Sequence, residues 1–438
     1  MSRKIYFLLG ALIVLALVLG ACQSATPEPA EPVTEEEVVE EAPETEEEPV
    51  AEEMDCESQG LPGALEGMCW EEIVEAADGG EVNWWMWGGS EVINRWVNDV
   101  VAPGLMEEYN ITLNLVPLAD ATEFVNQVFG EKEAGVDEDG AVSIMWINAE
   151  NFRTMKEGEL LYGPFAEQLP NAEYHTWDER TMTDSGVPTE GMEAPFAQFQ
   201  STFAYDMARS ENPETIDDLV QWIKDNPGRF TYSAPPDFVG SRFVRTICLD
   251  LVGGSVATPF DQELFDEKWP ACWDLLNELE PYLWREGETY PESMQAWFDL
   301  FAQGEVDMAF NTGQANWQFD IEAGRYEDTI RPFVLEDASY ASNTYIAIAY
   351  NAPMAPAVVA ANHIMSPEVQ FRMLSDLYWI PMIDVGGLPD DAKAEFAAFE
   401  FPPAIMDPAI LQANAIPQFH ASWYVPVEAG WTENVLLK

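Results

Sequence analysis

The sequence predicts an α/β protein of two lobes joined by a hinge, and three observations support this prediction. Apolar, strand-like segments alternate with amphipathic helical segments, which is typical of largely parallel sheets covered by helices. This alternation occurs in two separate parts of the chain. Two extended segments, residues 196–208 and 339–351, lie between those parts and suit crossings from one lobe to the other. With 438 residues and 47% hydrophobic content, the chain is long enough for two cores.

The first α/β unit begins with the aromatic stretch VNWWMW. It reads as a strand that ends at Gly88, with Trp84 and Met86 facing the core. Ser90 is a suitable N-cap for a helix whose apolar face runs from residue 92 to 101, and we expect Pro103 to end it. The segment ITLNLVPL then alternates as a strand, TEFVNQVFGEKEAG is helical, and AVSIMWIN reads as a buried strand.

The second unit repeats this order. ETIDDLVQWIKDNPG predicts a helix, RFTYSA a strand, and RFVRTICLDLVGG another helix. Two further helices precede the strand EVDMAFN, the helix QANWQFDIEAG and the strand TIRPFVLE. After the strand NTYIAIAYNAP, a helical segment restarts at Ser366 as N-cap and Pro367 as first helical residue.

The N-terminus predicts an export signal over residues 1–21. Arg3 and Lys4 precede an apolar run, and small residues precede Cys22. The ending LGAC resembles the bacterial lipobox, in which the cysteine sulfur receives a diacylglyceryl group. A membrane-spanning anchor is the alternative, but the run is short for a hydrocarbon core of ~30 Å. We therefore expect anchoring by a lipid on Cys22, in the periplasm or at the cell surface.

Residues 22–55 predict an acidic, disordered tether behind that lipid. Residues 23–55 contain 14 acidic residues and no Lys or Arg, so self-repulsion and proline oppose collapse. The whole chain has a net charge of −60, which excludes nucleic acid as a partner. This acidity either attracts a cationic ligand or reflects a saline environment.

The remaining four cysteines form an even set, and export favours disulfides. Of the three possible connectivities we choose the local pairs, Cys56 with Cys69 and Cys248 with Cys272. No cysteine or histidine spacing matches a metal site, and no nucleotide or cofactor motif is present, so we expect neither metal nor cofactor. Nucleophile motifs are also missing, and we expect no enzymatic activity.

Loops after several strands are suited to ligand binding, because ligands bind at the carboxyl ends of strands in open α/β sheets. In the stretch WGGS, the glycines would let a ligand reach the backbone at a helix N-terminus, and tryptophan would form a wall. The alternative is an ordinary strand-to-helix turn. For Trp87 the sequence leaves core packing and ligand contact open.

The chain resembles the solute-binding proteins of ABC importers, and more narrowly their Ynj-type family. The resemblance runs in order from about residue 82 to about 423. It rests on WGGSEVINRWV, WINAENFRTMKEGELLYGPFAEQLPN, PGRFTYSAPPDFVGSRF, LWREGETYP, GEVDMAFN, SNTYIAIAYNAP and HASW. It implies the type II periplasmic-binding-protein fold, with a mixed sheet in each lobe and a two-segment hinge.

The resemblance also implies a function and a division of the chain. A monomer would capture a small solute between its lobes and deliver it to a membrane permease driven by a cytoplasmic ATPase. We expect lobe 1 to begin at residues 56–200, lobe 2 to span 201–340, and 341–438 to return to lobe 1 with the C-terminal helices. Expected ligand contacts are Trp87, Gly88, Gly89, Ser90, Trp146, Asn148, Asn151, Tyr205, Asp237, Gly240, Ser241, Asn311 and Asn343.

The tryptophans and the acidity favour an organic cation, whereas the Gly-Gly-Ser helix start favours an anion. A zwitterion would reconcile these two indications. Two other functions remain as alternatives to transport. One is a surface scaffolding or adhesion lipoprotein, and the other is a tethered glycan hydrolase that uses a pair of carboxylates.

Overall fold

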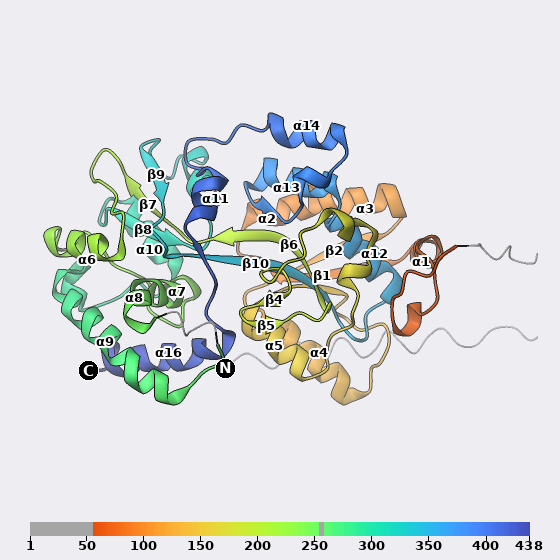
Figure 1. Ribbon diagram of the computed structural model, residues 1–438, viewed down its shortest axis with the longest axis horizontal. Coiled ribbons are helices and arrows are strands. Elements are labelled where there is room, and N and C mark those ends of the chain that lie inside the picture. Colours follow the sequence, from red (N-terminus) through yellow and green to blue (C-terminus); the bar gives the residue numbers. More distant parts are fainter. Residues whose placement is uncertain (1–55, 254–257) are drawn as a thin grey trace, which may run out of the picture. The chain divides into compact units, whose positions relative to one another are not determined.

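Two hydrophobic cores organise the chain in a computed structural model that describes residues 56–253 and 258–438 (Figure 1). We define lobe 1 as residues 56–200 and 341–398, and lobe 2 as residues 201–340 and 404–438, after the core to which most of their buried side chains belong. The predicted export signal, the lipidation of Cys22 and the acidic tether lie outside the described residues.

The sheet of lobe 1 has seven strands within the described residues, in the order β11-β6-β10-β3-β1-β2, with β12 paired to β10. Strands β1 to β3 are parallel, whereas β10 runs antiparallel to both β3 and β6. The strands are β1 (Glu81–Trp87), β2 (Thr112–Leu118), β3 (Ile144–Ile147), β6 (Glu193–Gln200), β10 (Ser339–Ile348), β11 (Ile380–Pro381) and β12 (Ala415–Ile416). Trp84 and Met86 are buried, as predicted.

Helices cover this sheet, with α2, α3 and α13 on one side and α4 and α5 on the other (Figure 1). The helices of lobe 1 are α1 (Trp70–Ala77), α2 (Glu91–Trp96), α3 (Ala102–Tyr109), α4 (Thr122–Ala134), α5 (Ala149–Glu157), α12 (Met354–Ile364), α13 (Pro367–Leu377) and α14 (Asp390–Ala398). The predicted caps Ser90 and Ser366 accept hydrogen bonds from Ile93 and Val369. The expected stop at Pro103 is wrong. A π-helical turn, η2 (Val97–Val101), precedes it, so Pro103 falls in the first turn of α3, where proline is tolerated.

The sheet of lobe 2 is smaller, with three antiparallel strands in the order β8-β7-β9. These strands are β7 (Thr202–Asp206), β8 (Met308–Asn311) and β9 (Ile330–Phe333). Helices supply most of the remaining core: α6 (Ile216–Asp225), α7 (Phe238–Ile247), α8 (Leu249–Val252), α9 (Gln262–Leu279), α10 (Met294–Ala302), α11 (Ala315–Glu322), α15 (Pro408–Ala413) and α16 (Tyr424–Trp431).

The strand expected at residues 229–234 does not form. Its backbone groups bond to three different loops instead of one neighbouring strand. The carbonyl of Arg229 accepts from Asp307, that of Phe230 accepts from Trp284, and the amide of Ala234 donates to Pro291. The segment is nevertheless part of the core of lobe 2, because Phe230 and Tyr232 are buried.

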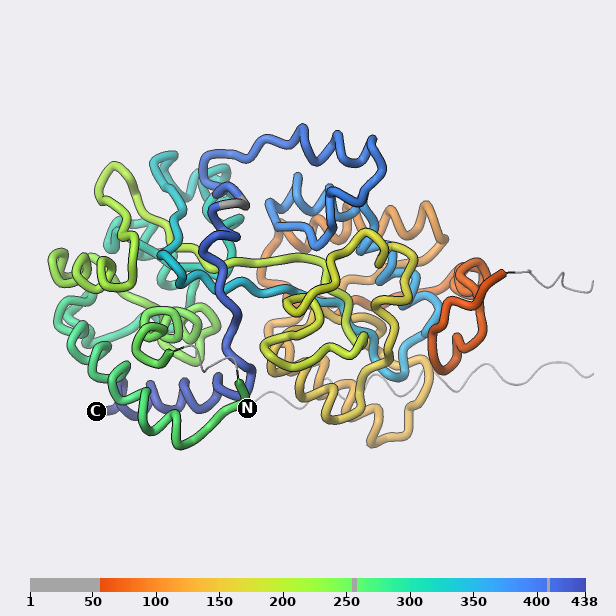
Figure 2. The backbone as a smooth tube through the Cα atoms, viewed as in Figure 1, coloured from red at the N-terminus to blue at the C-terminus, as the bar shows by residue number. Residues whose placement is uncertain are grey.

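The two predicted crossings are present. Strand β6 continues directly into β7, and β10 returns beside β6 (Figure 1). A third segment, residues 399–423, also crosses: it leaves lobe 1 after α14, and its buried residues Ala404, Phe419 and Trp423 belong to the core of lobe 2. Figure 2 shows this segment in blue. The expected return of residues 341–438 to lobe 1 is therefore wrong for their last part. The rings of Phe419 and Trp431 pack 6.2 Å from Trp269 and 5.3 Å from Tyr290, and so complete the aromatic core of lobe 2.

Both predicted disulfides are formed. Cys56 is bonded to Cys69 at the start of lobe 1, and Cys248 is bonded to Cys272 between α7 and α9 of lobe 2. In the part of the chain that the structure describes, no helix combines the length and apolarity that crossing a bilayer requires.

Candidate ligand-binding site

Among the contacts between the two lobes, two groups lie away from the hinge strands. At one, the amide of Ala421 donates to the carbonyl of Ser185 over 2.9 Å. At the other, the Tyr378 hydroxyl donates to Glu322 over 3.1 Å, and the Tyr378 ring lies 5.5 Å from that of Phe319. The two lobes are therefore in direct contact in this structure.

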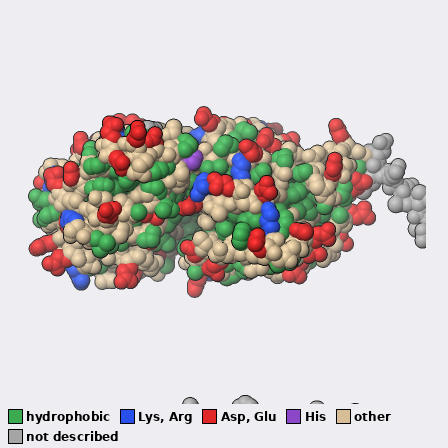
Figure 3. Space-filling model, turned by 90° about the horizontal axis from the view of Figure 1, so that it is seen from below, with side chains coloured by type: hydrophobic (Ala, Val, Ile, Leu, Met, Phe, Trp, Pro, Cys, Tyr) green, Lys and Arg blue, Asp and Glu red, His purple; other side chains and the backbone are tan. Residues whose placement is uncertain are grey.

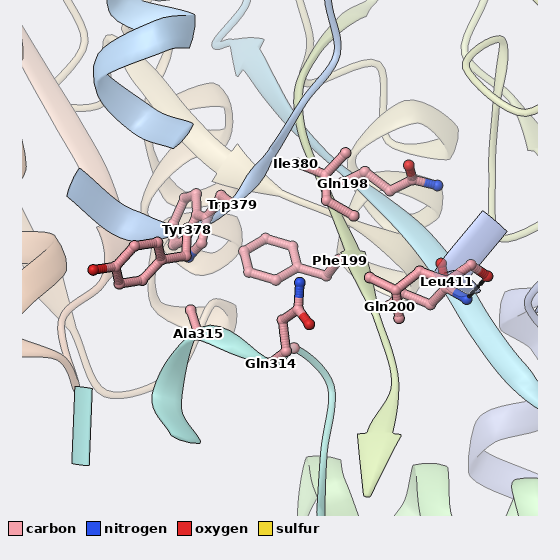
Figure 4. A pocket seen from close by; sticks show the side chains of 10 residues that line it. Gln198, Phe199, Gln200, Gln314, Ala315, Tyr378, Trp379, Ile380 and Leu411 are labelled. Atoms are coloured by element: carbon pink, nitrogen blue, oxygen red, sulfur yellow. Dashed lines mark hydrogen bonds between the residues drawn. The ribbon is translucent and has the colours of Figure 1, made fainter. Parts of the chain in front are cut away.

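An interlobe pocket lies beside β6 (Figure 4). Its enclosed volume is about 20 Å³, room for about one water molecule and far below the ~300–1,000 Å³ of usual small-molecule sites. Its lining comes from both lobes and from the third crossing segment: Gln198, Phe199, Gln200, Gly313, Gln314, Ala315, Tyr378, Trp379, Ile380 and Leu411. Only part of a solute would fit there without separation of the lobes.

At the lobe 1 side of this pocket, aromatic rings cover the end of β3. Trp146 stacks on Phe199 with centroids 6.2 Å apart and contacts Trp379 at 5.5 Å. The next loop turns sharply, because Ala149 has a left-handed φ of 53°. Its amide donates to the carboxylate of Asp184, which holds the loop in this conformation.

Asp184 and Glu193 form a buried acidic pair behind that loop. Burial raises the pKa of Asp184 to about 7. Burial, followed by the charge of Asp184, also raises the pKa of Glu193 well above its ordinary value of 4.5. Neither carboxylate oxygen of Glu193 has a hydrogen-bond partner among the described residues. A buried carboxyl without partners is most stable as the neutral acid.

In lobe 2, two arginines of α7 lie beneath the hinge. Arg242 and Arg245 are each 3% exposed and are the buried Lys or Arg side chains of the described residues. Arg245 donates to Ser241 over 2.7 Å and lies 4.1 Å from the Tyr424 ring. Ser241 in turn donates to Glu428 over 2.6 Å, and burial raises the pKa of that carboxyl. Arg245 thus belongs to a connected internal network.

Arg242 is less well satisfied. Its guanidinium donates to Ser201 over 3.2 Å and to Ser342 over 3.4 and 3.5 Å, and it lies 5.4 Å from the Phe238 ring. Ser201 follows β6 and Ser342 lies on β10, so these bonds reach both hinge strands. Burial lowers the pKa of Arg242 to about 10. Neither arginine forms an ion pair with a carboxylate of the described residues.

In this structure, the residues of the Gly-Gly-Ser turn make contacts within lobe 1. The Trp87 indole occupies the space where a side chain at Gly89 would lie, and Pro117 occupies the corresponding space at Gly88. Ser90 caps α2. The aromatics are thus crowded against glycines because only glycine leaves room for Trp87 to fold back. Trp87 keeps 38% of its surface exposed at the end of β1.

Two other predicted contacts have internal roles. Asp237 caps α7: its carboxylate accepts from Val239, Gly240 and Ser233, and also from the amide of Met294. A side chain at Gly240 would collide with the carbonyl of Ser233, so that glycine allows the close approach of α7. The carboxylate of Asp237 therefore has little capacity left for a ligand.

The remaining predicted residues lie on hinge strand β10, at or on helix α5, and in the sheet of lobe 2. Asn311, at the end of β8, is buried and its side-chain NH₂ has no partner among the described residues. Asn343 donates to the carbonyl of Arg180 over 2.7 Å. Asn148 precedes α5 without a side-chain cap hydrogen bond, and Asn151 is half-buried on α5. Tyr205 packs against Phe333, 5.6 Å away, inside lobe 2.

Sequence reasoning missed Arg242, Arg245 and the acidic pair. A signal for the arginines was present: two arginines three residues apart on an apolar helix, in a chain with 19 Lys and Arg against 79 Asp and Glu. The acidic pair gave no signal, because Asp184 and Glu193 are two carboxylates among 79.

Two lobes with separate cores, connected by paired hinge strands, define the class of solute-binding proteins. Residues 104–400 match the family model described as bacterial extracellular solute-binding protein, and the chain belongs to this family. It is 32% identical over 371 residues to Protein YnjB of Escherichia coli (strain K12), covering 83% of this chain and 92% of that protein. The resemblance to the Ynj-type proteins is confirmed.

Solved structures share the fold. The spermidine/putrescine ABC transporter substrate-binding protein PotD from Streptococcus pneumoniae matches with a TM-score of 0.58 and 15% identity, covering 81% of this chain and 99% of that one. A Trichodesmium protein (IdiA, FutA) in complex with iron and citrate matches with a TM-score of 0.53 and 11% identity, covering 82% and 99%. The predicted two-lobed fold is thus confirmed, and the chain is a solute-binding protein of the ABC-transporter type.

Proposed function

We propose that this protein is the lipid-anchored binding component of an ABC importer. It captures a small solute with polar or charged groups between its lobes and delivers it, chemically unchanged, to a permease coupled to a cytoplasmic ATPase. Family membership and the fold support the transport role. The lipobox-like sequence before Cys22 supports the anchor, and the acidic segment behind it supports a tether.

The observation that carries the proposal is the arrangement at the hinge. Residues of both lobes line one pocket beside β6, and polar groups without full hydrogen bonding lie next to the hinge strands. A solute that contacts both lobes makes all its contacts only when the lobes are closed, so binding shifts the population toward closure. We propose Trp87, Trp146, Asn148, Asn311 and Asn343 as ligand-facing residues.

A thermal-shift and calorimetry screen of the full chain, purified in detergent, tests solute binding. A ligand present at 100 times its Kd adds about 2.7 kcal/mol of stability, which raises the melting temperature measurably. X-ray scattering should then show a smaller radius of gyration with the hit than without it. Binding without compaction would contradict closure, and no response to any solute would contradict the transport role.

Substitution of the lipobox cysteine tests the anchor separately. Cys22→Ala should move the protein from the membrane fraction to the soluble fraction of the producing bacterium, while solute affinity stays unchanged. Cys22 is the residue that the diacylglyceryl group would modify, and the substitution leaves residues 56–438 intact. A variant that stays in the membrane fraction would show that the apolar run itself is the anchor.

A further inference from the structure

We infer that the transported solute carries an oxyanionic group, a carboxylate or a phosphate, and that Arg242 binds it beside the two hinge strands. This inference rests on the proposed function, because it identifies the solute class of the interlobe site. Arg242 does not line the pocket beside β6, but its partner Ser201 directly follows Gln200, which does. It replaces the organic cation, favoured from sequence, with an anion or a zwitterion.

The first argument is the lack of a counter-charge at Arg242. A buried charge is strongly destabilising unless a partner compensates it. The chain has 79 acidic residues, yet no described carboxylate forms an ion pair with this buried guanidinium. By contrast, other arginines of lobe 2 that are more exposed, such as Arg209 and Arg325, each form ion pairs with aspartates. An anion supplied from outside the chain would provide the missing charge.

The second argument is the geometry of the donors. A guanidinium offers five N–H donors in a planar fork that matches two oxygens of a carboxylate or phosphate. The bonds from Arg242 to Ser201 and Ser342 are long, at 3.2 to 3.5 Å, and both acceptors are hydroxyls that can rotate toward a ligand as donors. The Phe238 ring, 54% exposed, lies over the guanidinium and shields it from solvent.

The third argument is the contrast with Arg245, one helical turn away on α7. Ser241, Tyr424 and the nearby carboxyl of Glu428 already surround Arg245. Its environment is complete without a ligand, so we assign it a structural role. Arg242 also links lobe 2 to hinge residues Ser201 and Ser342, so an anion bound there would contact the strands that move when the lobes close.

The test compares wild type with Arg242→Met and Arg242→Lys in the full chain. The probes are succinate, citrate, glutamate and inorganic phosphate as anions or zwitterions, spermidine and thiamine as cations, and glucose as a neutral solute. We expect wild type to bind at least one of the first four. Preference between the carboxylates and phosphate then distinguishes the two oxyanion sources.

Arg242→Met should weaken binding of the active anion by about 100-fold or more, because it removes the charged partner. Its melting temperature without ligand should stay equal or rise, because a buried unpaired charge is replaced by an apolar chain. Arg242→Lys, which keeps the charge but loses the fork, should weaken binding by about tenfold. The matched control, Arg331→Gln on β9, removes a positive charge elsewhere in lobe 2 and should leave affinity unchanged.

Three outcomes would overturn the inference. Binding of spermidine, thiamine or glucose alone would leave the transport role standing and refute the anion. Unchanged anion affinity in Arg242→Met would place the anion site elsewhere. Silence toward every probe would count against the transport role and the anion site together. If Arg242→Met does not fold, Arg242→Lys decides, since wild-type affinity in that variant contradicts recognition by a guanidinium fork.

Discussion

Within the described residues, the buried carboxyl and guanidinium groups that lack an ion pair differ in sign between the two lobes. In lobe 1 they are the carboxyls of Asp184 and Glu193, and in lobe 2 they are the guanidinium groups of Arg242 and Arg245. The other buried carboxylates of lobe 2, Asp206 and Asp307, form ion pairs with arginines. A buried carboxyl can become neutral by taking up a proton, but a guanidinium stays charged in proteins. The carboxyls of lobe 1 can therefore avoid the free-energy cost of a buried charge by protonation. Arg242 in lobe 2 keeps its charge and needs a partner. This difference is the basis of our inference that lobe 2 supplies the charged contact to the solute.

The lobes also differ in how they build a core. Lobe 1 has a large sheet with aliphatic residues on its central strands, such as Ile144, Ile346 and Ile348. Lobe 2 has a sheet of three strands and fills its core with aromatic rings, including Phe203, which lies 5.2 Å from Phe333. The Cys248–Cys272 disulfide connects two of its helical segments.

The surface of the molecule does not show the difference in charge that the interior shows. On the face seen in Figure 3, acidic side chains are spread widely, with few basic side chains among them.

Removal of a disulfide should give the largest loss of stability. For a separation of 24 residues, replacing Cys248 and Cys272 by Ala should cost about 3.5 kcal/mol in the free energy of unfolding. Replacing Cys56 and Cys69, separated by 13 residues, should cost about 3 kcal/mol. Burial of both lobe 2 sulfurs adds to the difference. Urea titration measures both, and a larger loss for the Cys56 pair would contradict this order.

The acidic pair should make lobe 1 less stable as pH rises. The pKa of Asp184 is raised from 3.8 to about 7, so its stabilising contribution is present below pH 4 and is lost as pH rises through 7. Asp184→Asn, which keeps an acceptor for Ala149, should therefore stabilise the protein by about 2 kcal/mol at pH 8 and not at pH 4.

The measurement is urea unfolding of this variant and wild type from pH 4 to 8, with Asp137→Asn, at an exposed site, as the control. His175 acts in the opposite direction. Its pKa is lowered from 6.5 to about 4 by burial, so its contribution is lost as pH falls from 6.5 to 4. The variant must therefore be compared with wild type at each pH. Equal stability of the two proteins at pH 8 would contradict a raised pKa of Asp184.

Two residues that directly precede helices, Asp237 and Asn148, should distinguish an effect on stability from an effect on solute binding. Asp237→Ala should cost about 2 kcal/mol, because the carboxylate caps α7 and holds Met294. Asn148→Ala should leave stability nearly unchanged, because its side chain caps nothing, but it should weaken solute binding. Thermal unfolding and calorimetry on both variants check this. A stability loss in Asn148→Ala equal to that in Asp237→Ala would remove Asn148 from the proposed site.

Helix caps of the same type should give the smallest effects and no difference between the lobes. Ser90 accepts from Ile93 over 3.4 Å in lobe 1, and Ser293 accepts from Ala296 over 3.3 Å in lobe 2. Each Ser→Ala change should cost about 1 kcal/mol. Solute affinity should not change in Ser293→Ala. Weaker binding in Ser90→Ala, beyond its loss of stability, would restore the Gly-Gly-Ser turn as a ligand contact.

The sequence by itself determined the features that depend on neighbours along the chain. Periodicity placed most helices and strands, Ser90 and Ser366 marked helix starts, and the nearest cysteines were the bonded ones. These predictions succeed because hydrogen bonding and side-chain alternation within a segment repeat every two or 3.6 residues. The Pro103 prediction failed because a π-helical turn, which has no clear sequence signal, shifted its position in the helix.

Only the tertiary structure decided which polar residues are internal and which lack partners. Asp237 and Gly240 lie in a loop of the expected kind, yet their contacts are within lobe 2. In the sequence, Arg242 is one residue of a predicted helix. In the structure, it is buried beside Ser201 and Ser342 at the hinge strands. The burial and the charge pairing of Arg242 depend on segments more than 40 residues away in the sequence. Local sequence patterns do not show which distant segments come into contact.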